Sequence, residues 1–434
     1  MKSIDREILR IALPSIVSNI TVPLMGLVDV TIVGHLGSPA YIGAIAVGGL
    51  LFNIIYWIFS FLRMGTSGMT SQAYGRQDQP EILRLLVRSV GLGVLIAVLL
   101  IILQMPIVQG AFLFIHPTEE IRELATTYFR ICIWGAPAML GLYGLTGWYI
   151  GMQNSRIPMA VAITQNVVNI AASLSFVYWG GMKVEGVALG TLVAQWAGFG
   201  MGLCLWFRHY GHLRRFSLEG LWQREAMKRF FAVNRDIFLR TLCLVAVTMF
   251  FTSAGAAQGE IILAVNTLLM QLFTLFSYIM DGFAYAGEAL SGRYIGARNP
   301  KAFQDTVRHL FLWGGMMVLL FTGMYALGGN AFLGLLTDEP EVIAASGDYF
   351  LWALLIPVAG MAAFVWDGVF IGATATRGML MAMAAAALCF FGLYYGLREL
   401  WGNHALWLAF VTYLAMRGVV QTGLARGVRR KAFA

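Results

Sequence analysis

The sequence predicts an all-α integral membrane protein whose twelve transmembrane helices form two pseudo-symmetric bundles of six. Three observations lead to this prediction. Hydrophobic residues make up 59% of the 434 residues and charged residues only 12%, whereas soluble domains carry about 25% charged residues. Apolar stretches recur at the length of about 20 residues that crosses the hydrocarbon layer. Short motifs of the first half also recur in the second half at one fixed spacing.

The first apolar stretch, residues 8–34, follows a basic N-terminus and is predicted to be a transmembrane helix. It is too long for the apolar region of a signal peptide and lacks a small-residue cleavage site. Five further stretches follow, each ended by charged or turn-forming residues. The six predicted spans of the first half are residues 10–34, 41–70, 85–114, 124–151, 157–179 and 184–207.

The longest loop, residues 208–235, separates the two halves and is predicted to be cytoplasmic. The six spans predicted after it are residues 236–256, 260–290, 303–336, 342–372, 376–396 and 401–424. The chain is therefore divided into an N-terminal six-helix bundle (1–210), a cytoplasmic linker (211–235) and a C-terminal six-helix bundle (236–434).

The formal charge of +8 is unevenly distributed along the chain. If the N-terminus is cytoplasmic, all but four of the 30 Lys and Arg residues lie at cytoplasmic ends, the exceptions being Arg122, Arg130, Lys183 and Arg398. This bias follows the positive-inside rule and predicts that both termini are cytoplasmic. Orientation, with some contact to anionic lipid, therefore explains the basic excess, and no nucleic-acid partner is expected.

Short motifs of the first half recur 221 residues later in the second half. The matching positions are Tyr128-Phe129 with Tyr349-Phe350, Ile150-Gly151 with Ile371-Gly372, and Gly75 with Gly296. A constant offset of this kind indicates internal duplication. Because each half crosses the membrane an even number of times, the two halves have the same orientation. Parallel repeats around a site near the membrane midplane are typical of transporters.

Asp29 is the clearest ionisable residue within a predicted span, near the outer end of the first one. Such side chains cost roughly 2.5–3.5 kcal/mol each on insertion and are functional candidates by default. Burial in a medium of low dielectric disfavours a charged carboxylate, so Asp29 is expected to take up and release a proton near neutral pH. The alternative is a structural role as a hydrogen-bonded carboxylate at a helix end.

Four polar residues in the fifth and sixth spans are candidates for a cavity around Asp29. Asn166, Asn169 and Ser173 share one helical face because their spacing is i, i+3 and i+7. Counting residues from the outer helix ends places Ser173, Thr191 and Asp29 at similar depth. A polar cluster in the outer part of the N-terminal bundle is therefore predicted, although Asn166 is equally well explained as an interhelical packing residue.

Three further positions are of interest. Pro14 interrupts the first span on the cytoplasmic side of Asp29, and proline removes a backbone hydrogen bond and kinks a helix. Asp281 and Asp367 are secondary candidates in the second half, and no polar neighbour on their own helical faces can be named from the sequence.

Enzymatic function is not expected. The sequence contains no nucleotide-binding Gly-rich loop and no Ser-His-Asp signature. The four cysteines all lie in apolar stretches and indicate neither a disulfide framework nor a metal site. No metal and no cofactor is expected, so an ion gradient is the expected energy source.

Several segments resemble the multidrug and toxic compound extrusion (MATE) family, and in particular its DinF branch. They are LVDVTIVGHLG, TGWYIGMQNSRIPM, MKVEGVALGTLVAQ, NRDIFLRTL and DGFAYAGEALSGRYIGARN. The resemblance extends along essentially the whole chain. It implies two six-helix bundles in a V-shaped MATE-like fold, a multi-pass protein of the bacterial inner membrane, and a monomer.

The resemblance also implies antiport of organic cations or other amphiphiles against protons or sodium. It identifies Asp29 as the coupling residue, Pro14 as a helix hinge, and Asn169 and Thr191 as members of the same site. Many relatives have a second aspartate where this chain has Ser173, so a site with two carboxylates is not expected. Another cation site of the family pairs a glutamate of the seventh span with an aspartate of the tenth. The seventh span here has no membrane-embedded acid, so Asp367 alone does not complete that site, which favours protons over sodium.

The expected function is therefore proton-coupled export of small organic molecules, with membrane lipid as the surrounding partner. The alternative is a flippase for lipids or lipid-linked oligosaccharides, which would need a cationic cavity. Arg63, Arg235 and Arg240 are all counted near the cytoplasmic interface, so the sequence does not indicate such a cavity. A third alternative, a scaffold or passive channel, leaves Asp29 unexplained.

Overall fold

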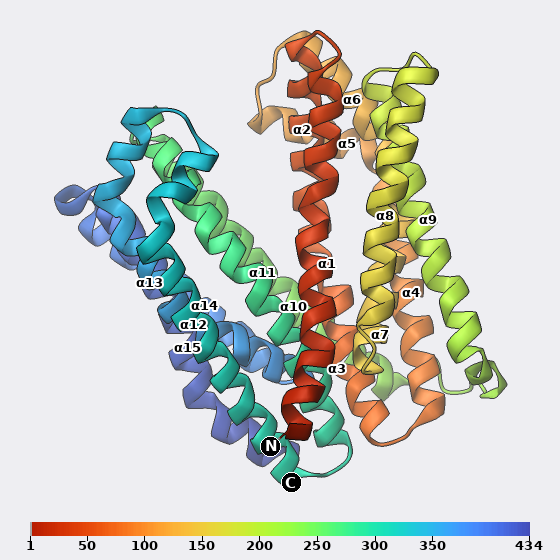
Figure 1. The fold of residues 1–434 in the computed structure, drawn as a ribbon. Coiled ribbons are helices and arrows are strands. Elements are labelled where there is room, and N and C mark those ends of the chain that lie inside the picture. The colour runs from red at the N-terminus through yellow and green to blue at the C-terminus, as the bar shows by residue number, and fades with distance from the viewer. Residues whose placement is uncertain (1) are drawn as a thin grey trace. The chain divides into compact units, whose positions relative to one another are not determined.

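The computed structural model describes residues 2–434, and every regular element in this range is a helix. Figure 1 shows their arrangement within each part of the chain. The elements are α1 (Lys2–Gly34), α2 (Pro39–Ile58), α3 (Phe61–Gly75), α4 (Gln79–Ile102), α5 (Gln104–Phe114), α6 (Glu119–Cys132), η1 (Ile133–Gly135), α7 (Ala136–Gly151), α8 (Arg156–Leu174), η2 (Ser175–Trp179), α9 (Val184–Tyr210), η3 (Gly211–Arg215), α10 (Arg224–Ala256), α11 (Glu260–Gly296), α12 (Pro300–Leu336), α13 (Pro340–Gly372), α14 (Thr376–Trp401) and α15 (Asn403–Ala432).

The prediction of an all-α membrane fold is confirmed, and each of the twelve predicted spans coincides with a helical stretch. Four spans in the first half consist of more than one helical element: α2 with α3, α4 with α5, α6 with η1 and α7, and α8 with η2. Eleven stretches among residues 2–434 are long and apolar enough to cross a membrane. The span that falls short is α6–α7, because charged residues occupy α6 and glycines occupy α7.

The chain divides into two compact units. The N unit is Pro14–Lys228, and the C unit contains Arg229–Ala434 together with the segment before Pro14. Helix α1 therefore belongs to both units, and the change from one to the other comes at Pro14. The sequence-based division instead assigned the whole N-terminal segment to the first bundle.

The internal duplication extends to one close helix contact in each unit. Helix α3 packs on α7 in the N unit, and α11 packs on α13 in the C unit. A Cβ atom at Gly147 would lie less than 3.0 Å from the carbonyl oxygen of Arg63, and one at Gly368 equally close to that of Ala284. Both residues of the second pair lie 221 positions after those of the first. Backbone contact through glycine is thus a repeated feature, as in tightly packed membrane helices.

The turns that follow α3 and α11 are duplicated as well. Gln77 and Arg298, each two residues after the end of its helix, adopt positive φ values of 57° and 54°. The next residues, Asp78 and Asn299, cap α4 and α12 by accepting a hydrogen bond from a backbone N–H three residues on. In each unit, the chain therefore reverses direction here through a residue in the left-handed conformation, followed by a side chain that caps the next helix.

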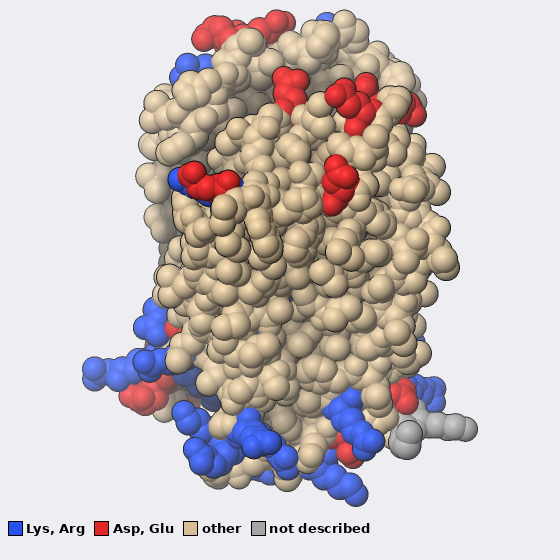
Figure 2. All heavy atoms as spheres, turned by 90° about the vertical axis from the view of Figure 1, so that its left-hand side faces the viewer, with Lys and Arg blue, Asp and Glu red and all other residues tan. Residues whose placement is uncertain are grey.

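Charges separate on the face drawn in Figure 2, which shows most Lys and Arg side chains at one end and most Asp and Glu side chains toward the other. The basic end is where the C-terminal segment of α15 lies, which carries Arg429, Arg430 and Lys431 in its last turn. A broad band without charged groups lies between the two ends. Such a separation is what the positive-inside rule describes, and the cytoplasmic placement of the basic end stays a prediction.

Candidate functional site

The Asp29 carboxylate lies within the N unit and is only 4% exposed. Helix α1 brings it against α9, where the hydroxyl of Thr191 donates a hydrogen bond of 2.9 Å to Asp29 Oδ2. Most of the neighbouring α1 residues are exposed, whereas Asp29 faces inward. The sequence-based expectation that Asp29 and Thr191 meet therefore agrees with the geometry.

Asn169 completes what we call the Asp29 cluster (Asp29, Asn169 and Thr191). Its side-chain Nδ2 donates to Thr191 Oγ1 over 3.2 Å, so α8, α9 and α1 are joined by one chain of hydrogen bonds. Two oxygens of the cluster, Asp29 Oδ1 and Asn169 Oδ1, are buried and have no hydrogen-bond partner. Buried polar atoms are usually paired, and unpaired ones are candidates for binding a proton, water or ligand.

Close packing of α8 on α9 positions the cluster. Gly190 precedes Thr191, and a Cβ atom there would lie less than 3.0 Å from the backbone of Ser173. Ser173 is fully buried and its hydroxyl has no hydrogen-bond partner. Asn166 is half-buried, and its amide donates to the Ala162 carbonyl of its own helix. The structure thus brings together Asn169, Ser173 and Thr191, and directs Asn166 to its own backbone.

Two residues of α6 were not identified by the sequence analysis as part of the site. Tyr128 and Cys132 are both buried and lie close enough to Asp29 to interact with it electrostatically. The Cys132 Sγ also donates to the Ala188 carbonyl of α9 over 3.7 Å. In the sequence, Tyr128 was noted only as part of a repeated motif. Its i, i+4 spacing to Cys132 could have indicated that the two residues share one helical face.

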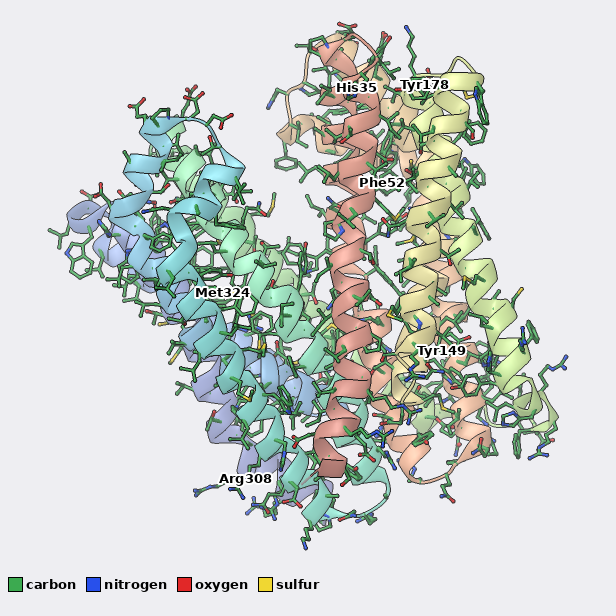
Figure 3. The ribbon with its side chains drawn as sticks, viewed as in Figure 1. His35, Phe52, Tyr149, Tyr178, Arg308 and Met324 are labelled. Carbon is green, nitrogen blue, oxygen red and sulfur yellow. The ribbon has the colours of Figure 1, made fainter. Side chains whose placement is uncertain are left out.

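Figure 3 shows where the cluster lies along the N unit. His35, just after α1, and Tyr178 of η2 are at one end of this unit, and Tyr149 of α7 lies toward the opposite end. Asp29 is six residues before His35 on the same chain segment, so the cluster lies in the half of the unit that contains His35. This is the predicted outer half.

Pro14 occupies the position in α1 where the helix passes from the C unit to the N unit. The Ser18 hydroxyl donates to the Pro14 carbonyl over 3.1 Å, and the Thr21 hydroxyl donates to the Ser18 carbonyl over 2.8 Å. Proline removes one backbone donor, and hydroxyls that bond back to the preceding turn favour bending. The predicted hinge therefore coincides with a boundary between structural units.

The C unit contains a second buried acid in a different environment. Asp367 accepts hydrogen bonds from Arg240, from Arg417 at 2.6 Å and from Gln421 at 2.7 Å, and all four side chains are buried. We call these four residues the Asp367 cluster. From the sequence, Arg240 was expected near the cytoplasmic interface, and no partner of Asp367 could be named. The members of the cluster come from α10, α13 and α15, which only the fold brings together.

Asp281, the other secondary candidate, is half-buried on α11 and interacts electrostatically with Arg417. Both secondary candidates, Asp367 and Asp281, therefore lie near arginines, in contrast to Asp29. Among the described residues, no group of three or more His, Cys, Asp or Glu side chains is placed to bind a metal ion.

The sequence matches the MatE family over residues 14–174 and 237–395. It is 39% identical over 422 residues to the DNA damage-inducible protein F of Escherichia coli (strain K12), covering 96% of this chain and 91% of that protein. It is also 23% identical over 358 residues to the probable multidrug resistance protein NorM of Thermotoga maritima, covering 79% and 74%.

Solved structures share the fold. A MATE crystal structure in the bent conformation aligns with a TM-score of 0.88 at 20% identity, covering 99% of this chain and 97% of that one. The Vibrio cholerae MATE transporter VcmN in the bent form aligns with a TM-score of 0.87 at 17% identity, covering 99% and 98%. Together with the family match and the E. coli relative, the many membrane-spanning helices show that this chain belongs to the MatE family of membrane transporters and is not an enzyme.

Proposed function

We propose that this transporter is a secondary active antiporter that exports organic cations or amphiphilic small molecules in exchange for protons, with Asp29 carrying the proton. The observation that supports this most directly is the environment of Asp29. One carboxylate oxygen accepts a hydrogen bond from a neutral hydroxyl, and the other is buried without a partner. No Lys or Arg among the described residues is paired with it.

Burying a charged carboxylate without a counter-ion costs free energy, and two states of the site remove this cost. Either a proton neutralises it, or a cation binds beside it. A site with these two alternatives exchanges one for the other: protonation from outside releases a cationic ligand, and loss of the proton restores the charge that attracts the next one. Movement of α1 at Pro14 is the proposed link between this exchange and access to the two sides of the membrane.

Protons rather than sodium are proposed as the coupling ion. Hard metal cations bind several oxygen ligands, preferably including more than one carboxylate or carbonyl. The Asp29 cluster offers a single carboxylate together with one amide and one hydroxyl oxygen. Asp367 does not supply an alternative, because two arginines already bind it.

The remaining features of the proposal concern the cellular setting. The transporter is proposed to act as a monomer in a bacterial inner membrane with both termini in the cytoplasm. It is proposed to need no cofactor other than the ion gradient. Its partners would be a small-molecule substrate and membrane lipid, and nucleic acid would not be one. The similarity to the E. coli protein and the charge distribution support this setting.

Transport by purified protein in liposomes tests the proposal. A pH gradient alone is expected to drive ethidium transport by the wild type, and Asp29→Asn is expected to abolish it. A sodium gradient alone should drive little transport. Asp338→Asn, which changes a carboxylate outside the spans, serves as the control. Sodium-driven transport, or an Asp29→Asn variant that works at the wild-type rate, would contradict the proposal.

The alternative of a lipid or lipid-linked oligosaccharide flippase requires a cationic site for a phosphate group. The structure does bury two arginines in the C unit, Arg240 and Arg417, but both bind Asp367. The buried arginines therefore offer no free pair of charges to a substrate. Scrambling of labelled lipid in the same liposomes would distinguish the two functions, because the antiporter is expected to leave it at the background rate.

A further inference from the structure

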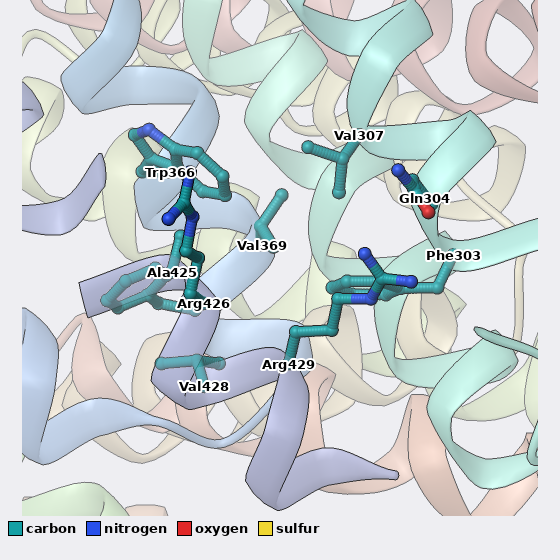
Figure 4. A pocket seen from close by; sticks show the side chains of 10 residues that line it. Phe303, Gln304, Val307, Trp366, Val369, Ala425, Arg426, Val428 and Arg429 are labelled. Atoms are coloured by element: carbon teal, nitrogen blue, oxygen red, sulfur yellow. The ribbon is translucent and has the colours of Figure 1, made fainter. Parts of the chain in front are cut away.

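A cavity in the C unit is lined by none of the residues of the Asp29 or Asp367 clusters. It is bounded by α12, α13 and α15 and has a volume of about 190 Å³. Figure 4 shows its wall, with Gln304 and Val307 from α12, Trp366 and Val369 from α13, and Arg426 and Arg429 from α15. Drug-sized ligands occupy sites of roughly 300–1,000 Å³. This cavity is therefore too small for a whole drug and fits part of a chain or ring.

The cavity combines apolar walls with two cationic groups. Val307, Val369 and Trp366 supply apolar surface, and the indole N–H of Trp366 is already used in a 2.8 Å hydrogen bond to Thr422 Oγ1. Arg426 and Arg429 are spaced i, i+3, so both project from one face of α15. A ligand that satisfies the site must therefore have an apolar part and a negative part.

The two guanidinium groups have no acidic partner in the described part of the protein. Neither Arg426 nor Arg429 forms a side-chain hydrogen bond or ion pair there, and both are exposed. Arg417, two to three turns earlier on the same helix, is buried and paired with Asp367. The charge of the last turns of α15 is thus left available to a ligand from outside the protein.

The position of the cavity along the helices identifies the kind of ligand. Gln304 lies in the first turn or two of α12, Val369 lies in the last turn of α13, and Arg429 lies in the last turn of α15. These helix ends are on the basic, predicted cytoplasmic side, where phospholipid head groups meet the hydrocarbon layer. Basic pockets between helices on this side bind anionic head groups.

We propose that this cavity is a binding site for an anionic phospholipid of the cytoplasmic leaflet. Arg426 and Arg429 bind the phosphate, and part of an acyl chain lies against Val307, Val369 and Trp366. Guanidinium groups bind phosphate through paired N–H donors, which two neighbouring arginines supply together. The site lies in the C unit and does not depend on which ion drives transport.

Native mass spectrometry of the full-length protein titrated with phosphatidylglycerol or phosphatidylethanolamine tests this proposal. The wild type is expected to bind its first phosphatidylglycerol more tightly than phosphatidylethanolamine. The double variant Arg426→Gln/Arg429→Gln is expected to lose about tenfold in that affinity. The matched control is Arg430→Gln/Lys431→Gln, which removes two charges from the same helix end outside the cavity and should bind as the wild type does.

A second pair of variants tests the apolar part separately. Val369→Trp fills the cavity and keeps both arginines, so it is expected to weaken phosphatidylglycerol binding to a similar extent. Val307→Phe provides the same test if the first variant does not fold. Inorganic phosphate at millimolar concentration should not displace the lipid. Equal losses in the control variant, unchanged binding in both filled variants, or displacement by phosphate alone would each overturn the proposal.

Discussion

Two buried aspartates illustrate how the same residue type serves different roles in one membrane protein. Asp29 has one neutral hydrogen-bond donor and an unpaired oxygen, whereas Asp367 binds two arginines and a glutamine. An acid whose charge is already compensated gains little from binding a proton. An uncompensated acid gains much, because burial of its charge is costly. We therefore propose proton exchange at Asp29 and a structural role for Asp367.

This difference predicts opposite effects of two identical substitutions on stability. Asp367→Asn leaves two buried arginines short of their counter-ion and is expected to reduce the free energy of unfolding by about 3–5 kcal/mol. Asp29→Asn replaces a poorly satisfied carboxylate by a neutral amide, so stability is expected to remain or to rise. Thermal unfolding of the two variants in detergent measures the contrast. A larger loss for Asp29→Asn than for Asp367→Asn would contradict the assignment.

The hydroxyl of Thr191 gives a second prediction at this scale. Thr191→Val keeps the shape of the side chain but removes the donor to Asp29 Oδ2. A hydrogen bond to a charged group contributes about 1.5–3 kcal/mol, so proton-driven transport is expected to fall by about tenfold or more. Thr191→Ser should retain most of the activity. Thr267→Val is the control, because the Thr267 hydroxyl bonds only to its own helix at Leu263. Equal rates for both valine variants would rule out the proposed role.

At the scale of elements, glycine determines how closely the paired helices approach. Gly147 on α7 faces the backbone of α3, and Gly368 on α13 faces that of α11. Both contacts occur at equivalent positions of the two repeats. The repeat was recognisable from the sequence because glycine and tyrosine motifs recur at a constant offset. Nothing in the sequence, however, showed which of the many glycines meet a backbone and which face open space.

Alanine substitution tests this distinction. Gly147→Ala and Gly368→Ala are each expected to destabilise the protein, because a Cβ atom there meets a backbone carbonyl that cannot move aside. Gly323→Ala on α12 is the control, because a Cβ atom there meets nothing within 4 Å. It is expected to leave stability unchanged or to raise it by up to about 1 kcal/mol, since alanine favours helix. Thermal unfolding of all three variants would show whether the two sites behave alike.

The helices themselves could be predicted from the sequence more readily than the contacts between their faces. The spans followed from length and hydropathy, which act locally along the chain. Asp29, Asn169 and Thr191 were grouped by counting depth in helices that cross the same layer. Arg240 and Arg417 could not be grouped with Asp367 in this way, because depth does not show which helix faces turn toward each other. The breaks inside the second, third and fourth spans were also missed, since apolar residues continue through them.

On the scale of the whole chain, two short segments are held by equivalent positions of the repeats. In the C unit, His309 on α12 bonds to Asp5 at 2.7 Å and Trp313 bonds to the same carboxylate at 3.1 Å. In the N unit, Arg88 on α4 donates to the carbonyls of Gly220 and Leu221, just before α10. His309 lies 221 positions after Arg88. The C unit thus holds the first turns of α1, and the N unit holds the segment just before α10.

Loss of these anchors is expected to loosen the segments without changing the transmembrane core. The variant Asp5→Asn/Glu7→Gln removes the acceptor charges that hold residues 2–13, including the 2.6 Å bond from Tyr294 to Glu7. Amide hydrogen exchange in that segment is expected to speed up, while exchange in 14–34 stays slow, because the bonds of Asp29 remain.

Arg88→Met should produce the same effect in residues 216–228. Glu225→Gln, which breaks only an exposed ion pair with Lys228, is the control. If α1 instead exchanges uniformly along its length in the first variant, then Pro14 does not separate two independently anchored parts of the helix, and the hinge must be sought elsewhere.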